Sequence, residues 1–474
     1  MSASAQSVLV NTAVATAGRV INTLLGVVVT AFITHSLGLA QFGSYTILLA
    51  YASILQIATD AGLYLTLSRV IAESPHREQE YISHTIWLRL LLGVIVFGLG
   101  AVVLFSIPAQ RIFIGPFIVL AMGFLFQSLS QLLMSVYQKY GIVWRVSLGD
   151  ILGRGAHIGA LVGIAGFQHI TIATAISAFT IGTAVAFLVH YVWVPLEKVL
   201  QKTIRWTTCK EILVASWPLG LMLFFNAIYF RIDTVILSFF RSAQEVGLYG
   251  LAYRIIESTL FFPAMFGGLI LPRITAALAK HDIPQAQQWL EQAVRFVLIT
   301  AVLGAVLLVF LGRPLAVLFG HDFSSAGSLL SILSLAMIIM FVGNMFGFTL
   351  VALGQGRYLL RLYAGLVVLN MGLNIVFIPW YGAVAASWTT VITEITSLTV
   401  AAWLVYRSIP WRLATIPLFR LALNAVATIG ILLLLPLEWD VVVRLAIASG
   451  FYFLLAWWLQ LFNRSTLHLL LQRA

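Results

Sequence analysis

The chain has 474 residues, of which 61% are hydrophobic and only 9% are charged, and its mean hydropathy is +1.01. This composition lies far outside the range of soluble globular proteins and is typical of an integral membrane protein. The formal net charge of +11 does not indicate nucleic-acid binding, because the basic residues are scattered over short loops instead of forming one patch with interleaved aromatic residues.

Apolar windows of about 20 residues predict where the chain crosses a membrane. Seven spans are predicted in the first half of the chain, near residues 10–35, 44–70, 83–105, 113–137, 147–166, 170–193 and 212–239. Seven more are predicted near residues 247–272, 296–312, 328–353, 362–379, 381–406, 421–437 and 445–462. These windows are too long and too continuously apolar for barrel strands. We therefore predict an all-α integral membrane protein with about 14 transmembrane helices.

The loops between these spans differ strongly in positive charge. Seventeen Lys and Arg residues fall in the loops of one side, whereas the other side holds only Arg111, Arg241, Arg313 and Arg444. Positive residues are enriched in cytoplasmic loops. We therefore expect the side with more Lys and Arg residues to be cytoplasmic, together with both chain termini.

An internal repeat relates the two halves of the chain. A shift of 204 residues places Gly43 and Tyr45 on Gly247 and Tyr249, and without a gap it also places Arg69 on Arg273. Six spans separate equivalent positions, so both copies have the same orientation, which predicts two lobes related by a pseudo-two-fold axis along the membrane normal. We expect a six-helix N-terminal lobe at residues 1–197 and a six-helix C-terminal lobe at 198–407. Residues 408–474 would hold two extra transmembrane helices and a short cytoplasmic tail.

Six arginines lie inside predicted spans, namely Arg19, Arg69, Arg89, Arg154, Arg231 and Arg254. A charged side chain at mid-membrane costs about 2.5–3.5 kcal/mol, so such residues usually face a wet cavity, a partner or a ligand. Arg69 and Arg89 lie near the cytoplasmic ends of their spans, where they can instead extend to the interface. Arg19 and Arg254 lie deeper, and for these two we favour contact with an anionic ligand, with Arg231 as a third candidate.

Other polar residues in the spans are candidate site or coupling residues. Asn22 follows Arg19 within one turn, and Asn344 contributes uncharged polarity to the second lobe. Asp60 and Glu394 have no oppositely charged partner in their own spans, so we consider them as ion-coupling residues.

Buried ion pairs also hold transmembrane helices together, and this structural role is the alternative at each charged position. It applies most directly to the fifth span, where Asp150, Arg154 and His157 share one stripe and Arg154 can pair with Asp150.

Sequence motifs for several catalytic functions are missing. The chain has no G-x-x-x-x-G-K-[ST] phosphate loop, no H-E-x-x-H and only one cysteine, Cys209. We therefore expect no ATP hydrolysis, no cofactor and no metal site, and we expect that the chain is not an enzyme.

Three sequence blocks resemble a known family. The first is the run "NTAVATAGRVINTLLG…THSLGLAQFGSYTILL…DAGLYLTLSRVIAE", which begins at residue 11. The second is "FRIDTVILSFFRSAQEVGLYGLAYRIIE" with the later "LPRITAALA", and the third is "LFGHDFSSAGSLLSIL". In order and spacing these blocks resemble Wzx-type polysaccharide and O-antigen lipid flippases, in the same exporter superfamily as the lipid II flippase and the MATE drug antiporters. Relatives commonly carry an Arg-Tyr pair before Leu-Gly, where this chain has His35 and Ser36.

The resemblance implies a transporter of the bacterial inner membrane with a central cationic cavity that opens alternately to the cytoplasm and the periplasm. The implied substrate is an undecaprenyl-diphosphate-linked oligosaccharide, and the implied partners include a polysaccharide polymerase and chain-length machinery. Arginine suits forked phosphate recognition, so the resemblance implies that Arg19 and Arg254 contact the head group.

Two alternatives stay open beside the flippase interpretation. A MATE-like cation antiporter would present net acidic residues to its cavity, and the spans hold six bases against five acids. A membrane polymerase or ligase of lipid-linked sugars usually needs a large external loop, and the predicted external loops are short. For a flippase, either the membrane potential, worth about 2.3 kcal/mol per charge at 100 mV, or an ion gradient would drive export.

Overall fold

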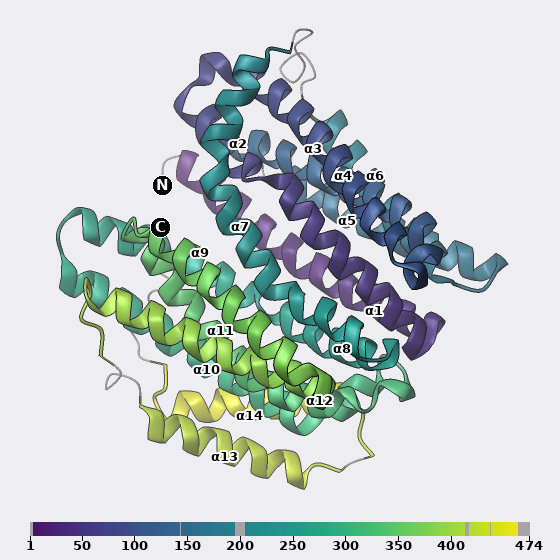
Figure 1. Ribbon diagram of the computed structural model, residues 1–474. Coiled ribbons are helices and arrows are strands. Elements are labelled where there is room, and N and C mark those ends of the chain that lie inside the picture. Colours follow the sequence, from purple (N-terminus) through teal and green to yellow (C-terminus); the bar gives the residue numbers. More distant parts are fainter. Residues whose placement is uncertain (1–2, 143, 195–203, 413–416, 437, 463–474) are drawn as a thin grey trace. The chain divides into compact units, whose positions relative to one another are not determined.

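The computed structural model describes residues 3–142, 144–194, 204–412, 417–436 and 438–462. The helices of the first half are α1 (Ala3–Asp60), α2 (Leu63–Glu73), α3 (Glu78–Ser106), α4 (Ile114–Lys139), α5 (Trp144–Phe167), α6 (Ile172–Val192) and α7 (Trp206–Phe240). Those of the second half are α8 (Ala243–Thr259), α9 (Phe261–Ala279), α10 (Ile283–Val317), α11 (Ala326–Ala352), α12 (Gly356–Tyr406), α13 (Leu418–Leu434) and α14 (Val441–Trp458). Three short 3₁₀ turns complete the regular structure of the described residues (Figure 1). The predicted all-α class is confirmed.

Two long helices each contain two predicted spans joined at a glycine. In α1 the break is at Gly38 (φ 68°), and in α12 it is at Gly382 (φ 56°). Positive φ values are readily adopted only by glycine, so these residues permit the reversal between neighbouring spans. Ten helical segments of the described chain have the length and hydropathy to cross a membrane. When the two broken helices are counted twice, and the more polar α5 and the shorter α13 are added, the described residues supply the predicted fourteen crossings.

The reversal in α12 is capped on both sides by charged side chains, one from the first turn of α8 and one from just before that helix. A Glu245 carboxylate oxygen accepts a hydrogen bond from the Ala383 backbone N–H at 2.7 Å, just after Gly382. Arg241 donates to the carbonyl oxygens before the break, including that of Pro379 at 3.0 Å. The carboxylate thus lies at a helix N-terminus and the guanidinium at a helix C-terminus, as the helix dipole favours.

We expect Glu245→Ala to lower the free energy of unfolding by about 1–2 kcal/mol, because it removes the acceptor for an N-terminal backbone N–H. Glu245→Gln keeps a carbonyl oxygen at this position and should recover most of that loss. Thermal unfolding of both variants in detergent is the measurement, and equal losses for the two variants would contradict the capping role.

The chain divides into two compact units, Met1–Ser238 and Phe239–Ala474. The units divide one helix later than the predicted lobe boundary at residues 197 and 198, because α7 packs with the first unit. Cys209 and Ile212 of α7 are buried in the same hydrophobic cluster as Leu63 and Leu67 of α2. The lobe ranges 1–197, 198–407 and 408–474 and the pseudo-two-fold axis remain predictions.

Polar contacts reinforce the start of α7 against α3. Glu211 accepts a hydrogen bond from the Tyr81 hydroxyl at 2.9 Å and lies 3.3 Å from the Arg77 guanidinium. Thr208 donates to Glu80 at 2.9 Å, and Glu80 in turn accepts from Arg77. Hydrogen bonds to Glu80 and Glu211 raise the pKa of Arg77 above its ordinary value. These hydrogen bonds therefore favour the charged form of Arg77 and join the start of α3 to α7.

The second unit is built around α10 and α11, which pack against each other, and the two C-terminal helices lie on α10. The Tyr452 hydroxyl of α14 donates to the Ile299 carbonyl oxygen of α10 at 2.7 Å. Asn424 of α13 donates to the Tyr452 carbonyl oxygen at 3.3 Å. The helices α13 and α14 are therefore packed parts of this unit.

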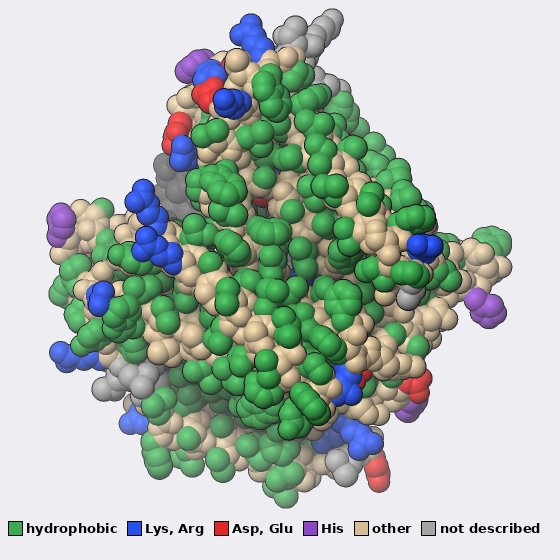
Figure 2. Space-filling model, viewed as in Figure 1, with side chains coloured by type: hydrophobic (Ala, Val, Ile, Leu, Met, Phe, Trp, Pro, Cys, Tyr) green, Lys and Arg blue, Asp and Glu red, His purple; other side chains and the backbone are tan. Residues whose placement is uncertain are grey.

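Large apolar side chains are exposed along the helices of both units. On α3, for example, Val94, Leu99 and Val102 are each more than half exposed. Figure 2 shows hydrophobic side chains over most of the visible face, with Lys and Arg gathered toward the helix ends. This pattern is expected of helices that face lipid.

Candidate functional site

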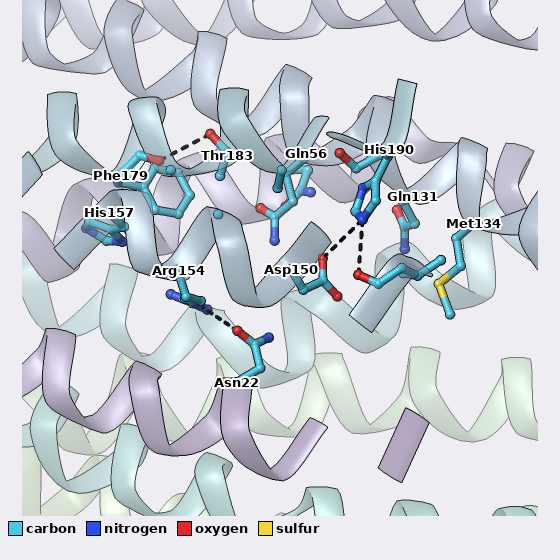
Figure 3. A pocket seen from close by; sticks show the side chains of 16 residues that line it. Asn22, Gln56, Gln131, Met134, Asp150, Arg154, His157, Phe179, Thr183 and His190 are labelled. Carbon is cyan, nitrogen blue, oxygen red and sulfur yellow. Dashed lines mark hydrogen bonds and ion pairs between the residues drawn. The ribbon is translucent and has the colours of Figure 1, made fainter. Parts of the chain in front are cut away.

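A polar cavity of about 280 Å³ lies inside the first unit, between α1, α4, α5 and α6 (Figure 3). Its polar lining side chains are Asn22, Gln56, Gln127, Ser130, Gln131, Asp150, Arg154, His157, Thr183 and His190. Met134 and Phe179 contribute apolar wall. Ten polar groups around one space within membrane-spanning helices form an unusually hydrophilic site, and such groups mark substrate or ion pathways.

Small residues bring α5 and α6 close together beside the cavity. A Cβ atom at Gly153 would lie 2.7 Å from the Gly182 carbonyl oxygen, and one at Gly182 would lie 2.8 Å from the Gly153 carbonyl oxygen. One turn earlier, a Cβ atom at Gly149 would lie 2.3 Å from Nε2 of His190. This is the small-xxx-small packing of transmembrane helices, and it places the His190 ring directly against α5.

His190 and Asp150 lie close together in the wall of the cavity (Figure 3). Nε2 of His190 lies 3.9 Å from an Asp150 carboxylate oxygen and 3.1 Å from the Val146 carbonyl oxygen. The Tyr137 hydroxyl donates to the His190 carbonyl oxygen at 2.5 Å. These contacts fix the imidazole, which is almost fully buried.

Arg154 and Asn22 connect α5 to α1 across the cavity wall. Nε of Arg154 donates to the side-chain oxygen of Asn22 at 3.2 Å. Asn22, a predicted site residue, therefore lines a polar cavity, although its role as a substrate contact stays a proposal. The predicted pairing of Arg154 with Asp150 also stays a prediction. The Arg19 side chain lies outside the described part of the structure.

Three glutamines of the cavity wall were missed by the sequence analysis. In the described part of the chain, the side-chain amides of Gln56, Gln127 and Gln131 make no hydrogen bond to protein groups. Gln127 and Gln131 are exposed and lie one turn apart on α4, within an otherwise apolar span. That i, i+4 spacing of two amides in a predicted span was the available signal.

The remaining predicted substrate contacts lie on other helices. Arg231 is half-buried on α7, and Asp233, two residues later, is buried. Arg254 is half-buried on α8 in the second unit. Asn344 of α11 donates to the Met340 carbonyl oxygen of its own helix at 3.3 Å. None of these three lines the cavity of the first unit, and their roles stay proposals.

Asp60 and Arg89 form a buried ion pair between α1 and α3. The expectation that Arg89 extends to the membrane interface is wrong, because its side chain has 0% exposure. The reason is that Asp60, on another span, offers a closer negative partner. The Arg69 side chain is 66% exposed and lies 3.5 Å from Glu73, and its extension to the interface stays a prediction.

The two predicted ion-coupling residues differ in their surroundings. Asp60 is engaged with Arg89, so ion coupling through Asp60 would require that this pair opens. Glu394 is buried in α12, with 6% exposure, close in sequence to buried Thr390 and Thr393. Ion coupling stays a proposal for both residues.

A family model described as Polysaccharide biosynthesis protein matches residues 8–278, more than half of the chain. The chain belongs to this family. A second model, described as MatE, matches residues 218–376. The predicted resemblance to polysaccharide exporters and their MATE relatives is thereby confirmed.

Individual relatives support the family assignment. The probable low-salt glycan biosynthesis flippase Agl15 of Haloferax volcanii is 26% identical over 375 residues, covering 76% of this chain and 76% of that protein. The lipid II flippase MurJ in an inward closed conformation has a TM-score of 0.78 at 13% identity, covering 97% of this chain and 100% of that chain. An inward-facing MATE multidrug resistance transporter of the MOP superfamily has a TM-score of 0.70 at 18% identity, covering 84% of this chain and 98% of that chain. These structural likenesses establish a shared fold.

Proposed function

We propose that this protein flips a lipid-linked oligosaccharide across a membrane by alternating access. The flippase relative and the transporter folds point to a transporter rather than to an enzyme. The observation that supports the proposal most directly is the polar cavity between the membrane-spanning helices of the first unit. A sugar head group carries many hydroxyls and needs such a path, because an unpaired polar group in hydrocarbon is costly.

In its specific form, the proposal names an undecaprenyl-diphosphate-linked oligosaccharide that moves from the cytoplasmic to the periplasmic leaflet of the bacterial inner membrane. Arg19 and Arg254 would contact the diphosphate, with Arg231 as a weaker candidate and with Asn22 and Asn344 as uncharged contacts. Polysaccharide polymerase and chain-length machinery would receive the product.

The driving force would be the membrane potential or an ion gradient. Two phosphate charges that leave a negative interior gain about 4.6 kcal/mol at 100 mV. If an ion contributes, Asp60 or Glu394 would bind it. Flipping in proteoliposomes with an imposed potassium diffusion potential separates the two sources, because a potential-driven flippase works without a proton or sodium gradient.

We expect Arg254→Ala to lower the initial flipping rate about 10- to 100-fold, since a hydrogen bond to a charged group contributes about 1.5–3 kcal/mol. The assay follows a fluorescent undecaprenyl-diphosphate-linked oligosaccharide in proteoliposomes containing equal amounts of folded protein. Arg69→Ala is the matched control, because it removes an exposed arginine, and its rate should stay within about twofold of the unchanged protein. A normal rate for Arg254→Ala would remove this residue from the head-group site.

A MATE-like cation antiporter is the second candidate, favoured by the MatE match over residues 218–376. Expression in a drug-sensitive host decides between the two. Resistance to organic cations without export of lipid-linked glycan would support the antiporter.

A further inference from the structure

The cavity of the first unit contains amide groups that the protein itself does not use. Within the described residues, Gln56 of α1 and Gln127 and Gln131 of α4 make no hydrogen bond to other protein groups, although all three lie on membrane-spanning helices. An amide left without a partner in such surroundings is unfavourable. Water or a ligand in the cavity must therefore satisfy these groups.

The charges of the cavity wall do not favour an anion. One arginine, Arg154, is balanced by one carboxylate, Asp150, and both also interact with protein groups. Most of the remaining polar wall consists of amides and hydroxyls. An amide both donates and accepts hydrogen bonds, as a sugar hydroxyl does, whereas a diphosphate only accepts them at neutral pH.

The size and the apolar wall limit the ligand further. A cavity of about 280 Å³ lies just below the usual range of about 300–1,000 Å³ for sites that bury a drug-sized ligand. A space of this size accommodates one sugar ring. Phe179 and Met134 provide apolar surface for the C–H face of such a ring, while Gln56 and Gln131 lie at the same cavity (Figure 3).

We propose that this cavity is a subsite for one neutral sugar ring of the lipid-linked oligosaccharide, recognised through its hydroxyls by Gln56, Gln127 and Gln131. The inference rests on the proposed function and makes it more specific. The diphosphate would bind elsewhere, at arginines that do not line this cavity. The glutamines would then select substrates by their sugar and would contribute nothing to the binding of a lipid diphosphate without sugar.

The first experiment measures transport by the full-length protein in proteoliposomes. The substrate is polyprenyl-diphosphate-linked oligosaccharide extracted from cells that make it, and the competitor is undecaprenyl diphosphate without sugar. We expect Gln127→Leu and Gln131→Leu each to raise the half-saturating substrate concentration about 2- to 10-fold. Inhibition by the competitor should be unchanged. Gln168→Leu, in the exposed turn after α5, is the matched control and should leave both values unchanged.

The second experiment detects occupancy of the cavity without disturbing a glutamine. Thr183→Cys, at a partly exposed residue of the cavity wall, is placed in a Cys209→Ser background, and its rate of alkylation by N-ethylmaleimide is measured. The glycan-linked lipid should slow alkylation about fivefold or more, as expected for a site that is mostly occupied. Undecaprenyl diphosphate alone should leave the rate unchanged.

The outcomes separate the subsite from the proposed function. Transport that continues without protection of Thr183→Cys would overturn the sugar subsite and leave the flippase function intact. Equal protection by undecaprenyl diphosphate would also overturn it, because the cavity would then bind the diphosphate. No transport and no binding of the glycan-linked lipid by the folded protein would overturn the proposed function itself.

Discussion

Replacing Asp60 by alanine is expected to lower the free energy of unfolding by about 3–5 kcal/mol, because the Arg89 guanidinium would remain charged and unpaired inside the helix bundle. Both side chains of this pair are buried. Among the described residues, Nε and Nη1 of Arg89 have no hydrogen-bond partner. The guanidinium is hydrogen-bonded only through Nη2, which donates to Asp60.

A double variant tests whether the loss comes from the uncompensated charge. Asp60→Leu combined with Arg89→Met removes both charges and should recover most of the stability, since apolar replacements of buried pairs are often neutral or stabilising. Asp322→Ala removes an exposed carboxylate and should change stability by about 0.5 kcal/mol or less. Denaturant unfolding in detergent measures all three. If the double variant is as unstable as Asp60→Ala, the ion pair is not the cause.

Replacing Gly62 by alanine is expected to destabilise the first unit by about 3–5 kcal/mol, because two costs add at this position. Gly62 has φ 76°, in the left-handed region. A Cβ atom there would lie 2.5 Å from both the Gly220 nitrogen and the Ser216 carbonyl oxygen, which are backbone atoms of α7 that cannot rotate away. The backbones of α2 and α7 would have to separate.

Three other glycines separate these two costs. Gly38→Ala tests the backbone conformation alone, since φ is 68° and the added Cβ would meet nothing within 4 Å, and it should cost about 1–2 kcal/mol. Gly220→Ala tests the close approach, with its Cβ 2.4 Å from the Ala61 carbonyl carbon. Gly26→Ala, in open space on α1, should stabilise by about 0.5–1 kcal/mol. A Gly62→Ala variant no less stable than Gly38→Ala would contradict the contact between α2 and α7.

The spans could be predicted because hydropathy is a sum over neighbouring residues. The windows located α3, α4, α6 and α11 correctly, whereas α10 begins at Ile283, well before its predicted start near residue 296. They did not reveal the interruption between Asp60 and Leu63 inside the second predicted span. At that interruption a Cβ atom on Gly62 would lie 2.5 Å from the backbone nitrogen of Gly220, a residue far away in the sequence.

The site was predictable only in part, because its residues come from positions that lie far apart in the sequence. Asn22 stood out as a polar residue beside an intramembrane arginine, and it does line a polar cavity. Arg89 was expected at the interface because it lies near the end of its span. Its partner Asp60 could not be recognised from the sequence, because it lies 29 residues away on another helix. The glutamines of α4 carry no charge and were therefore not predicted as site residues, although their amides line the cavity without a hydrogen bond to protein groups.

The sequence alone determined the membrane-spanning helical class and the family, because both depend on composition and on local order along the chain. Only the tertiary structure decided which polar side chains meet. Which side chains face each other depends on the rotation of each helix about its axis and on how closely two helix backbones approach. Close contacts such as that between Gly153 and Gly182 determine both the rotation and the distance. A single-residue change in that rotation, about 100° on a helix, would turn a cavity residue toward lipid without changing the hydropathy of its span.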